Sequence, residues 1–416
     1  MFFLYQIIVS TLLLISPVII IYRILKNKED SKRFIEKFSI SSEKRGKGKL
    51  IWFHGASVGE IMSIIPLIKY YEKNKSINKI LITSSTLSSS KIIKKFKFKK
   101  TIHQFYPVDH FLLTNNFLNH WKPSLAIFIE SEIWPYMFKN LKDKKIPLIL
   151  LNARITKKTF NRWSKISFFS KLIFGMITVA YPQNLETKYF LKKIKTKKIN
   201  RIGNLKFAEN PEENFTIKNK KLKSELNKNK IWVASSTHKN EEIFCANAHK
   251  ELKKKNKNLI TIIIPRHVHR ANEIALEMKK INLNVAYHSS KIQTLKNIDI
   301  YIVDTFGETK LFHKISSTVF LGGSIIKRGG QNPLEAARLG SKILHGPNTD
   351  NFKDVYKHLK LLNISKKINT PLQLASSIVF KKNKNSGKKI KKIGQKILNK
   401  TINELDNLIN NEFKKT

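Results

Sequence analysis

The chain has 416 residues, of which 41% are hydrophobic, and this is enough for two packed domains of ordinary size. Its single cysteine, Cys245, excludes an internal disulfide and a metal cluster built from several cysteines, so a reducing compartment is expected. The formal net charge is +50, but the lysines are spread over the whole length. A basic surface that attracts anionic lipids or phosphorylated substrates is therefore favoured over a nucleic-acid-binding protein, which stays a minor alternative.

The first apolar segment, Phe2 to Tyr22, contains no charged residue, and Arg23, Lys26 and Lys28 follow it. About 20 apolar residues is the length of a membrane span. The residues after this segment do not form a signal-peptide cleavage site, and the basic flank predicts that the rest of the chain is cytoplasmic. We therefore expect a membrane anchor over residues 1–25. Pro17 leaves a shallow interfacial insertion open as an alternative.

After this anchor, short apolar runs alternate with segments of helical periodicity, which is typical of βαβ units around parallel sheets. The predicted strands are 49–53, 80–83, 125–129, 147–151, 177–181, 231–234, 259–264, 299–303, 319–321 and 343–344. The clearest predicted helices are 60–72, 240–255 and 271–280. This pattern predicts an α/β protein with two Rossmann-like, doubly wound domains facing a cleft, where ligands would meet the carboxyl ends of the strands.

Composition suggests the domain boundaries. We expect an N-terminal domain over 26–208, a polar linker over 209–229 and a C-terminal domain over 230–380. Residues 381–416 are rich in lysine, with isoleucines at near-helical intervals, and are expected to form a basic helical tail.

A glycine-rich stretch, FLGGSIIKRGGQNPLEAARLG at residues 320–340, follows a predicted strand. Asn332 suits a helix N-cap, Pro333 the first helical position and Glu335 the third. Such a loop gathers backbone N–H groups that can bind a phosphate. The alternative is a tight turn in which Glu335 folds back on Asn332 as a capping box.

Polar motifs follow the other predicted strands, and together they carry a resemblance. They are HGASVGE (54–60), ESEIWP (130–135), NARIT (152–156), GNLKF (203–207), STHKNEE (236–242), PRH (265–267), DTFGE (304–308), GGSIIKRGGQNPLEAA (322–337) and GPNTDNF (346–352). In this order the chain resembles the 3-deoxy-D-manno-octulosonic acid (Kdo) transferases of lipopolysaccharide synthesis. The resemblance implies a GT-B fold and an inverting, metal-independent transfer of Kdo from CMP-Kdo to a lipid A precursor, lipid IVA. It also implies the cytoplasmic face of the inner membrane, with anionic membrane lipids as partners and no nucleic acid or cofactor.

The same resemblance implies the catalytic residues. Glu60, at the start of a predicted helix, matches the general base, although Ser57 to Glu60 also reads as a capping box. A helix N-terminus is expected to lower the pKa of such a carboxyl. Glu130 and Lys206 match the groups that assist the transition state, a carboxylate for positive charge on the sugar and a lysine for the sugar carboxylate or leaving phosphate.

The second domain is expected to bind CMP. The predicted contacts are Pro265, Arg266, Phe306, Gly307, Glu308, Asn332, Pro333, Leu334 and Glu335. Arg266 suits phosphate, Gly307 allows a close backbone approach, and Glu335 can accept hydrogen bonds from the ribose hydroxyls. For His238 and His267 we favour structural roles at a helix cap and in a loop. No H-x-x-x-H pair stands beside a carboxylate at a strand end, so no metal is predicted.

Two features differ from the family or leave the function open. Phe306 stands where the family would have methionine, which concerns one wall of the nucleotide site, and the end of the chain matches no family motif. A nucleotide-sugar epimerase on the same two-domain fold is the second enzymatic hypothesis. It would turn over a nucleotide sugar without any lipid. The number of Kdo residues transferred does not follow from the sequence.

Overall fold

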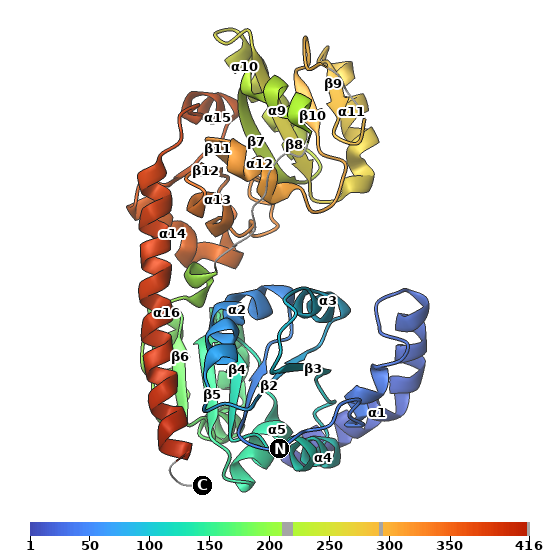
Figure 1. The fold of residues 1–416 in the computed structure, drawn as a ribbon, viewed down its shortest axis with the longest axis vertical. Helices are drawn as coiled ribbons and strands as arrows, with labels where there is room; N and C mark the ends of the chain where they lie inside the picture. The colour runs from blue at the N-terminus through green and yellow to red at the C-terminus, as the bar shows by residue number, and fades with distance from the viewer. Residues whose placement is uncertain (210–218, 291–293, 414–416) are drawn as a thin grey trace. The chain divides into compact units, whose positions relative to one another are not determined.

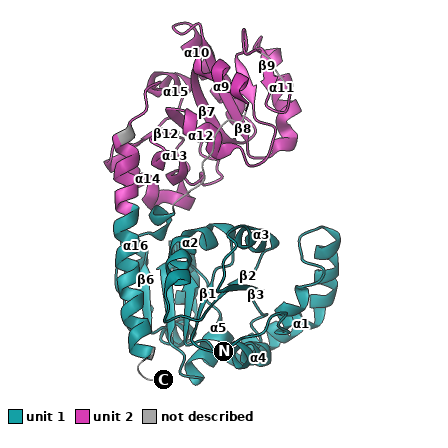
Figure 2. Ribbon diagram, viewed as in Figure 1, with its two compact units in different colours: residues 1–210, 394–416 teal, residues 211–393 magenta. Residues whose placement is uncertain are grey.

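The computed structural model describes residues 1–209, 219–290 and 294–413. The chain forms two compact units, shown in separate colours in Figure 2. Unit 1 comprises Met1–Asn210 and Gly394–Thr416, and unit 2 comprises Pro211–Ile393. Each is built around its own parallel β-sheet (Figure 1). Residues 210–218 of the predicted linker lie outside the described residues.

The sheet of unit 1 has six parallel strands in the order β3-β2-β1-β4-β5-β6. Their bounds are β1 (Leu50–His54), β2 (Lys79–Ser84), β3 (Thr101–Phe105), β4 (Leu125–Ile129), β5 (Leu148–Ala153) and β6 (Val179–Pro182). The strands between the two edges are buried, which explains their uninterrupted apolar runs. The sequence prediction omitted β3, because this edge strand is half polar, with His103 and Gln104 at its centre.

Helices connect these strands. They are α1 (Phe2–Leu25), α2 (Val58–Lys73), α3 (Leu87–Lys95), α4 (Phe111–Trp121), α5 (Pro135–Asp143), α6 (Lys157–Lys165), α7 (Ser167–Phe174) and α8 (Leu185–Lys193), with 3-10 turns η1 (Phe34–Phe38) and η2 (Leu205–Ala208). The helix α2 begins at Val58 and carries the predicted isoleucine stripe, which packs on β1 and its neighbours in the core.

The last helix, α16 (Lys384–Phe413), contributes residues to both units. In unit 1 its Leu405 and Ile409 are buried in the sheet core, and Asp406 accepts hydrogen bonds from Tyr70 and Tyr71. A Cβ on Gly394 would lie 2.1 Å from the Phe207 carbonyl oxygen. Only glycine therefore allows α16 to pack this closely on η2, the turn that carries Lys206.

The sheet of unit 2 has seven parallel strands in the order β13-β12-β11-β7-β8-β10-β9. They are β7 (Lys230–Thr237), β8 (Leu259–Pro265), β9 (Val285–Tyr287), β10 (Ile300–Ile302), β11 (Thr318–Leu321), β12 (Lys342–His345) and β13 (Ser365–Lys367). The two edge strands, β9 and β13, were not predicted. Each has only three residues, and the sequence of β13 is Ser-Lys-Lys.

The helices of unit 2 are α9 (Lys220–Asn227), α10 (Glu241–Lys253), α11 (Ala271–Lys280), α12 (Thr309–Ile315), α13 (Leu334–Arg338), α14 (Lys353–Leu361) and α15 (Pro371–Ser377), with η3 (Val268–Arg270) and η4 (Asp350–Phe352). The prediction that residues 209–229 are linker is wrong for α9. The side chain of Asn219 caps this helix, and Leu226 is buried against unit 2. One buried leucine among lysines is too weak a pattern to reveal a helix.

The strand order reverses at the β1/β4 pair in unit 1 and at the β7/β11 pair in unit 2. At such a switch point the loops leave the sheet in opposite directions, which opens a crevice at the carboxyl ends of the strands. Two Rossmann-like parallel sheets, as expected for a GT-B protein, are thus confirmed. The polar motifs HGASVGE and ESEIWP flank the first switch point, and the motif STHKNEE and the glycine loop flank the second.

Candidate active site

Glu60 lies in the first turn of α2, directly after β1. Ser57 is the N-cap, and its hydroxyl accepts a hydrogen bond from the Glu60 amide at 3.4 Å. Glu60 Oε2 accepts hydrogen bonds from the amides of Ala56 at 2.6 Å and Ser57 at 3.2 Å. The capping box is therefore formed, but these bonds use one carboxylate oxygen, Oε2. Glu60 can therefore cap the helix through Oε2 and still use Oε1 in chemistry.

The pKa of Glu60 is raised to about 7, and burial is the largest cause. The negative charges of Glu132 and Glu130 raise it further, and the hydrogen bonds from Ser57 and Ala56 only partly offset these effects. The expectation that the helix N-terminus lowers this pKa is therefore wrong. A carboxylate with a pKa near 7 is a stronger base than an ordinary glutamate, and about half of it is ionised at neutral pH.

Glu130 and Lys206 form an ion pair, with 2.5 Å between Lys206 Nζ and Glu130 Oε1. Glu130 is 5% exposed and follows β4 with a left-handed φ of 58°. Asn152, at the end of β5, is also left-handed, with a φ of 53°, and its Oδ1 accepts a hydrogen bond from the Leu205 amide at 3.0 Å. Asn204 Oδ1 accepts from the Lys206 amide. Two strained strand ends thus hold the lysine against the glutamate, and such strain concentrates at functional sites.

Glu132 was not among the predicted site residues, although it stands in the ESEIWP motif. Its Oε2 lies 3.2 Å from His54 Nε2 and accepts a hydrogen bond from Trp134 Nε1 at 2.9 Å. Burial would raise the pKa of Glu132, but the interactions with His54 and Trp134 outweigh burial and lower it. Glu132 therefore keeps its negative charge, which helps to raise the pKa of Glu60.

In unit 2, Glu335 lies in the five-residue helix α13. This helix begins one residue later than predicted, with Pro333 as N-cap, and Asn332 Oδ1 accepts from the Leu334 amide at 3.1 Å. Glu335 does not close a capping box on Asn332. Its Oε1 lies 3.2 Å from His313 Nδ1, and His313 Nε2 lies 3.0 Å from Ser235 Oγ. His313, which no motif indicated, thus orients Glu335, and the interaction lowers the pKa of Glu335 despite burial.

Glu241 organises the glycine loop from the first turn of α10. Its side chain is fully buried, and its two oxygens accept hydrogen bonds from the amides of Gly323 at 2.7 Å, Ser324 at 3.0 Å and Ile325 at 2.9 Å. The His238 amide donates to the same carboxylate at 3.1 Å. The chain itself supplies the anion for these amides, so this part of the loop is a fixed structural element. The N–H groups that we expected to bind a phosphate lie farther along the loop, at residues 332–335.

The other predicted CMP contacts lie at the same edge of the unit 2 sheet. Pro265 ends β8, and Arg266 is exposed, with its amide bonded to the Thr237 carbonyl. Phe306 is 83% exposed after β10, Gly307 has a φ of 92°, and Glu308 is the N-cap residue of α12. His238 and His267 make no side-chain cap in α10 or η3, contrary to the role that we favoured for His238.

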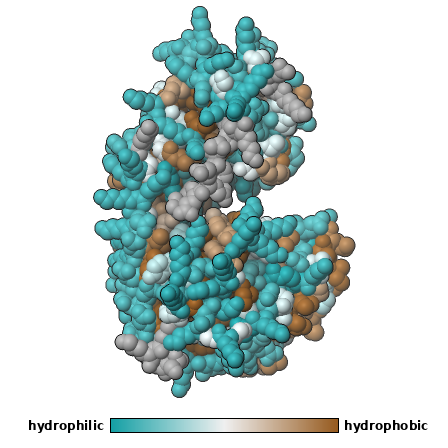
Figure 3. Space-filling view, in the orientation of Figure 1, coloured by the Kyte–Doolittle hydropathy of each residue, from teal (hydrophilic) through white to brown (hydrophobic). Residues whose placement is uncertain are grey.

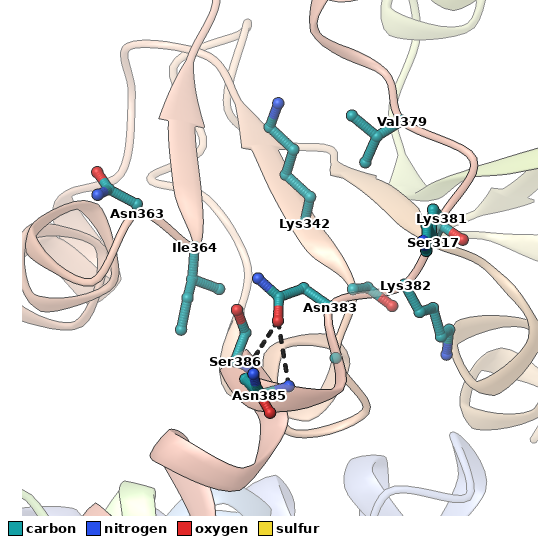
Figure 4. Close-up of a pocket in the computed structure, with 12 residues that line it drawn as sticks. Ser317, Lys342, Asn363, Ile364, Val379, Lys381, Lys382, Asn383, Asn385 and Ser386 are labelled. Carbon is teal, nitrogen blue, oxygen red and sulfur yellow. Dashed lines mark hydrogen bonds between the residues drawn. The ribbon is translucent and has the colours of Figure 1, made fainter.

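A cavity of about 710 Å³ in unit 2 contains none of the predicted site residues (Figure 4). Its lining includes Ser317 before β11, Lys342 at the start of β12 and Asn363 before β13, so it lies at the amino ends of the strands. Asn383 caps the start of α16 there through the amides of Asn385 and Ser386. Among the described residues, no group of three or more His, Cys, Asp or Glu side chains is arranged to hold a metal.

Comparison with known proteins identifies the family of this chain. The family model described as 3-Deoxy-D-manno-octulosonic-acid transferase (kdotransferase) matches residues 32–209. A 3-deoxy-D-manno-octulosonic acid transferase of Rickettsia bellii is 34% identical over 93% of this chain and 92% of that protein. The chain belongs to the Kdo transferase family. The predicted family and the predicted class of enzyme, a glycosyltransferase, are thereby confirmed.

Two further comparisons separate fold from activity. A probable mitochondrial 3-deoxy-D-manno-octulosonic acid transferase of Arabidopsis thaliana is 33% identical to this Kdo transferase, over 88% of this chain and 85% of that protein. A putative UDP-N-acetylglucosamine 2-epimerase from Listeria monocytogenes has a TM-score of 0.58 but only 12% identity, over 89% of this chain and 98% of that one. The second likeness concerns the fold alone. It gives the epimerase hypothesis no support beyond the shared architecture.

Proposed function

We propose that this enzyme transfers Kdo from CMP-Kdo to a lipid A precursor, lipid IVA, with inversion at the anomeric carbon and without a metal. The reaction would belong to lipopolysaccharide core synthesis at the cytoplasmic face of the inner membrane. The observation that carries the proposal is the group formed by Glu60, Glu130 and Lys206 at the switch point of unit 1. In this group a half-buried carboxylate has a pKa of about 7, next to an ion pair at a strained strand end.

In the proposed reaction the acceptor hydroxyl oxygen attacks the anomeric carbon of Kdo while the bond from that carbon to the phosphate oxygen of CMP breaks. The bonding electron pair leaves with CMP, and Glu60 takes the proton of the hydroxyl. Since Oε2 of Glu60 is held by the amides of Ala56 and Ser57, Oε1 is the oxygen that we assign to the proton. The fixed Oε2 would also hold the carboxylate plane in one orientation, which limits the entropy lost on reaction.

Glu130 and Lys206 carry opposite charges at the same place, and an inverting sugar transfer can use both. The ring of Kdo gains positive charge as the phosphate departs, and a carboxylate stabilises that charge. Kdo also has a carboxylate of its own, which an ammonium group can bind. We propose that the 2.5 Å pair keeps both charges fixed before substrate binds, so that little reorganisation is needed during the reaction.

For the donor, we propose that Arg266 binds the phosphate of CMP and that Glu335 accepts hydrogen bonds from the ribose hydroxyls. Arg266 is exposed at a strand end, and its guanidinium can form two parallel hydrogen bonds to a phosphate. The contact with His313 keeps Glu335 ionised and oriented, as an acceptor requires. Pro265, Phe306, Gly307, Glu308, Asn332, Pro333 and Leu334 would complete the nucleotide site, and no cofactor is required.

The test is incubation of the purified enzyme with CMP-Kdo and tetraacylated lipid A precursor, followed by mass measurement of the lipid. A mass increase by one or more Kdo residues is expected, and the increase counts the sugars transferred. In a parallel reaction without lipid, UDP-N-acetylglucosamine should remain unchanged. Turnover of that nucleotide without modification of the lipid would reject the proposal and favour an epimerase.

A further inference from the structure

The helix α1 is long and apolar enough to cross a membrane by length and composition. Most of its large apolar side chains are exposed, and within α1 the buried ones are Val9 and Ile20. Figure 3 shows hydrophobic side chains gathered over this part of unit 1. Apolar surface of this extent is costly in water, so another apolar phase must cover it. The remaining question is whether the helix crosses that phase or lies within one side of it.

The first turns of α1 are fixed to the folded body of unit 1. The Tyr5 hydroxyl donates a hydrogen bond to Asp109 Oδ2 at 2.8 Å, and Gln6 Nε2 lies 2.7 Å from His110 Nε2. The Phe2 ring packs edge-on against Phe169 of α7, with 5.1 Å between the ring centroids. The Phe2 carbonyl accepts a hydrogen bond from the Tyr136 hydroxyl at 3.0 Å. These contacts come from three different elements of the body, so they define one position for the start of α1.

The other end of α1 is fixed to the same body. Arg23 Nε donates to Glu29 Oε2 at 3.1 Å, and Lys37 Nζ lies 2.5 Å from the same oxygen. Lys37 belongs to η1, where Glu36 Oε2 accepts a hydrogen bond from the Phe105 amide of β3 at 2.8 Å. Glu29 and Glu36 are both buried. The end of α1 is therefore connected through η1 to the edge strand of the unit 1 sheet.

These two attachments conflict with a transmembrane orientation. From Phe2 to Arg23 the helix rises about 31 Å, which equals the thickness of the hydrocarbon core, about 30 Å. A spanning helix would place these two residues on opposite faces of the membrane. The same folded body could then contact both ends only by lying inside the bilayer, where its charged surface would be unfavourable.

We propose that α1 does not cross the membrane but lies in one leaflet, as part of a membrane-docking surface of unit 1. This surface consists of the exposed side of α1 together with Leu112 of α4, which is 60% exposed, and Phe168 of α7, which is 79% exposed. Leu112 lies two residues after His110, which contacts Gln6 of α1. Phe168 directly precedes Phe169, which packs against Phe2 of α1. The expected partner is a bilayer with anionic headgroups.

Charge favours anionic lipids over a protein partner. Exposed basic side chains flank the apolar surface, namely Lys26 and Lys28 after α1, Arg162 and Lys165 in α6, and Lys171 in α7. Each basic residue near an anionic membrane surface contributes about 1 kcal/mol of attraction. Apolar insertion combined with several such charges gives stable binding without a span. This inference does not depend on the identity of the donor or the acceptor.

Topology provides the first test. An epitope tag placed before Met1 of the full-length chain is expected to be protected from protease in intact spheroplasts and digested in inside-out vesicles, as is a tag after Thr416. Digestion of the N-terminal tag in intact spheroplasts, with the C-terminal tag still protected, would show a spanning helix and overturn the proposal.

A second measurement does not require a tag. The Phe168→Glu variant is expected to bind vesicles of mixed neutral and anionic phospholipid about ten-fold more weakly in a flotation assay, because an inserted aromatic side chain is replaced by a charge. The control is Leu361→Glu, since Leu361 is 75% exposed on α14 of unit 2 and should not affect binding. Equal binding by the Phe168→Glu variant and the wild type would exclude α7 from the surface. Neither experiment measures transfer, so both remain informative if the proposed reaction is wrong.

Discussion

The carboxylates of the two units differ in the groups that surround their negative charge. In unit 2, Glu241 receives hydrogen bonds from four backbone amides and Glu335 is paired with His313, so each has a fixed partner. In unit 1, Glu60 lies near two further carboxylates, Glu130 and Glu132, and its pKa is raised to about 7. Satisfied carboxylates build a rigid binding site, whereas crowded ones supply a group that can exchange a proton near neutral pH. This difference supports the proposal that unit 1 carries the chemistry and unit 2 binds the nucleotide.

The largest expected effect comes from Glu60→Gln. The glutamine oxygen can still accept from the amides of Ala56 and Ser57, so the helix cap is kept while the base is lost. We expect kcat to fall by about two to four orders of magnitude, the usual contribution of a positioned base. Binding of CMP, measured by calorimetry, should not change. Near-normal transfer by this variant would reduce Glu60 to its capping role.

The same variant has an expected effect on stability that depends on pH. The folded-state pKa of Glu60, about 7, lies above its ordinary value of 4.5, so folding takes up a proton between these values. The stability that the carboxyl contributes at low pH is therefore lost as the pH rises through 7. Thermal unfolding should show Glu60→Gln to be more stable than the wild type at pH 8, and this advantage should be absent at pH 4. An equal difference at both pH values would contradict the raised pKa.

The next largest effect is expected in unit 2, from Glu241→Ala. Removal of this buried carboxylate leaves the amides of Gly323, Ser324 and Ile325 without their acceptor, and we expect a loss of about 3 kcal/mol or more in the free energy of unfolding. The matched control is Glu251→Ala on the same helix. Glu251 forms an exposed pair with Lys254, and its loss should change the free energy by less than about 0.5 kcal/mol. Equal effects of the two changes in denaturant titrations would show that Glu241 does not hold the loop.

A smaller effect is expected on the pH dependence of transfer. The general base must be ionised, so kcat/KM of the wild type should rise with pH to a plateau, with a midpoint near 7. Glu132→Gln removes one of the charges that raise this pKa and should move the midpoint to lower pH. Glu132→Asp keeps the charge and is the control. An unchanged midpoint in Glu132→Gln would show that Glu132 does not raise this pKa and would leave burial and Glu130 as its causes.

Some parts of the fold and of the candidate site could be predicted from the sequence and others could not, for physical reasons. Buried parallel strands are continuous apolar runs, and the central strands of both sheets were therefore predicted, whereas the edge strands β3, β9 and β13 are short or polar. The motifs placed Glu60 and Glu130 at strand ends. The sequence could not show that burial and Glu132 reverse the effect of the helix N-terminus on Glu60, because both depend on tertiary packing.

The partners of the predicted residues were also beyond the sequence. His313 and Ser235, which orient Glu335, come from elements that are distant in sequence, and no local pattern connects them. Glu241 was visible only as one of two adjacent glutamates at a helix start. The structure shows that its carboxylate binds loop amides 82 to 84 residues away. Long-range contacts of this kind determine whether a glycine-rich loop is open to a ligand or already filled.

The smallest effect that we predict comes from Gly307→Ala. This variant tests whether the loop at Gly307 in unit 2 contacts the nucleotide. Gly307 has a φ of 92°, and a Cβ there would meet no atom within 4 Å, so only backbone strain of about 1 kcal/mol opposes the change in the free protein. If the CMP moiety approaches this backbone, the added methyl group should also weaken CMP binding several-fold, which calorimetry can measure. Gly59→Ala is the control, because a Cβ at Gly59 in α2 also meets open space and its φ is not positive. A Gly307→Ala enzyme that is less stable but binds CMP as the wild type does would remove this loop from the nucleotide site and leave Arg266 and Glu335 as the donor contacts to be tested.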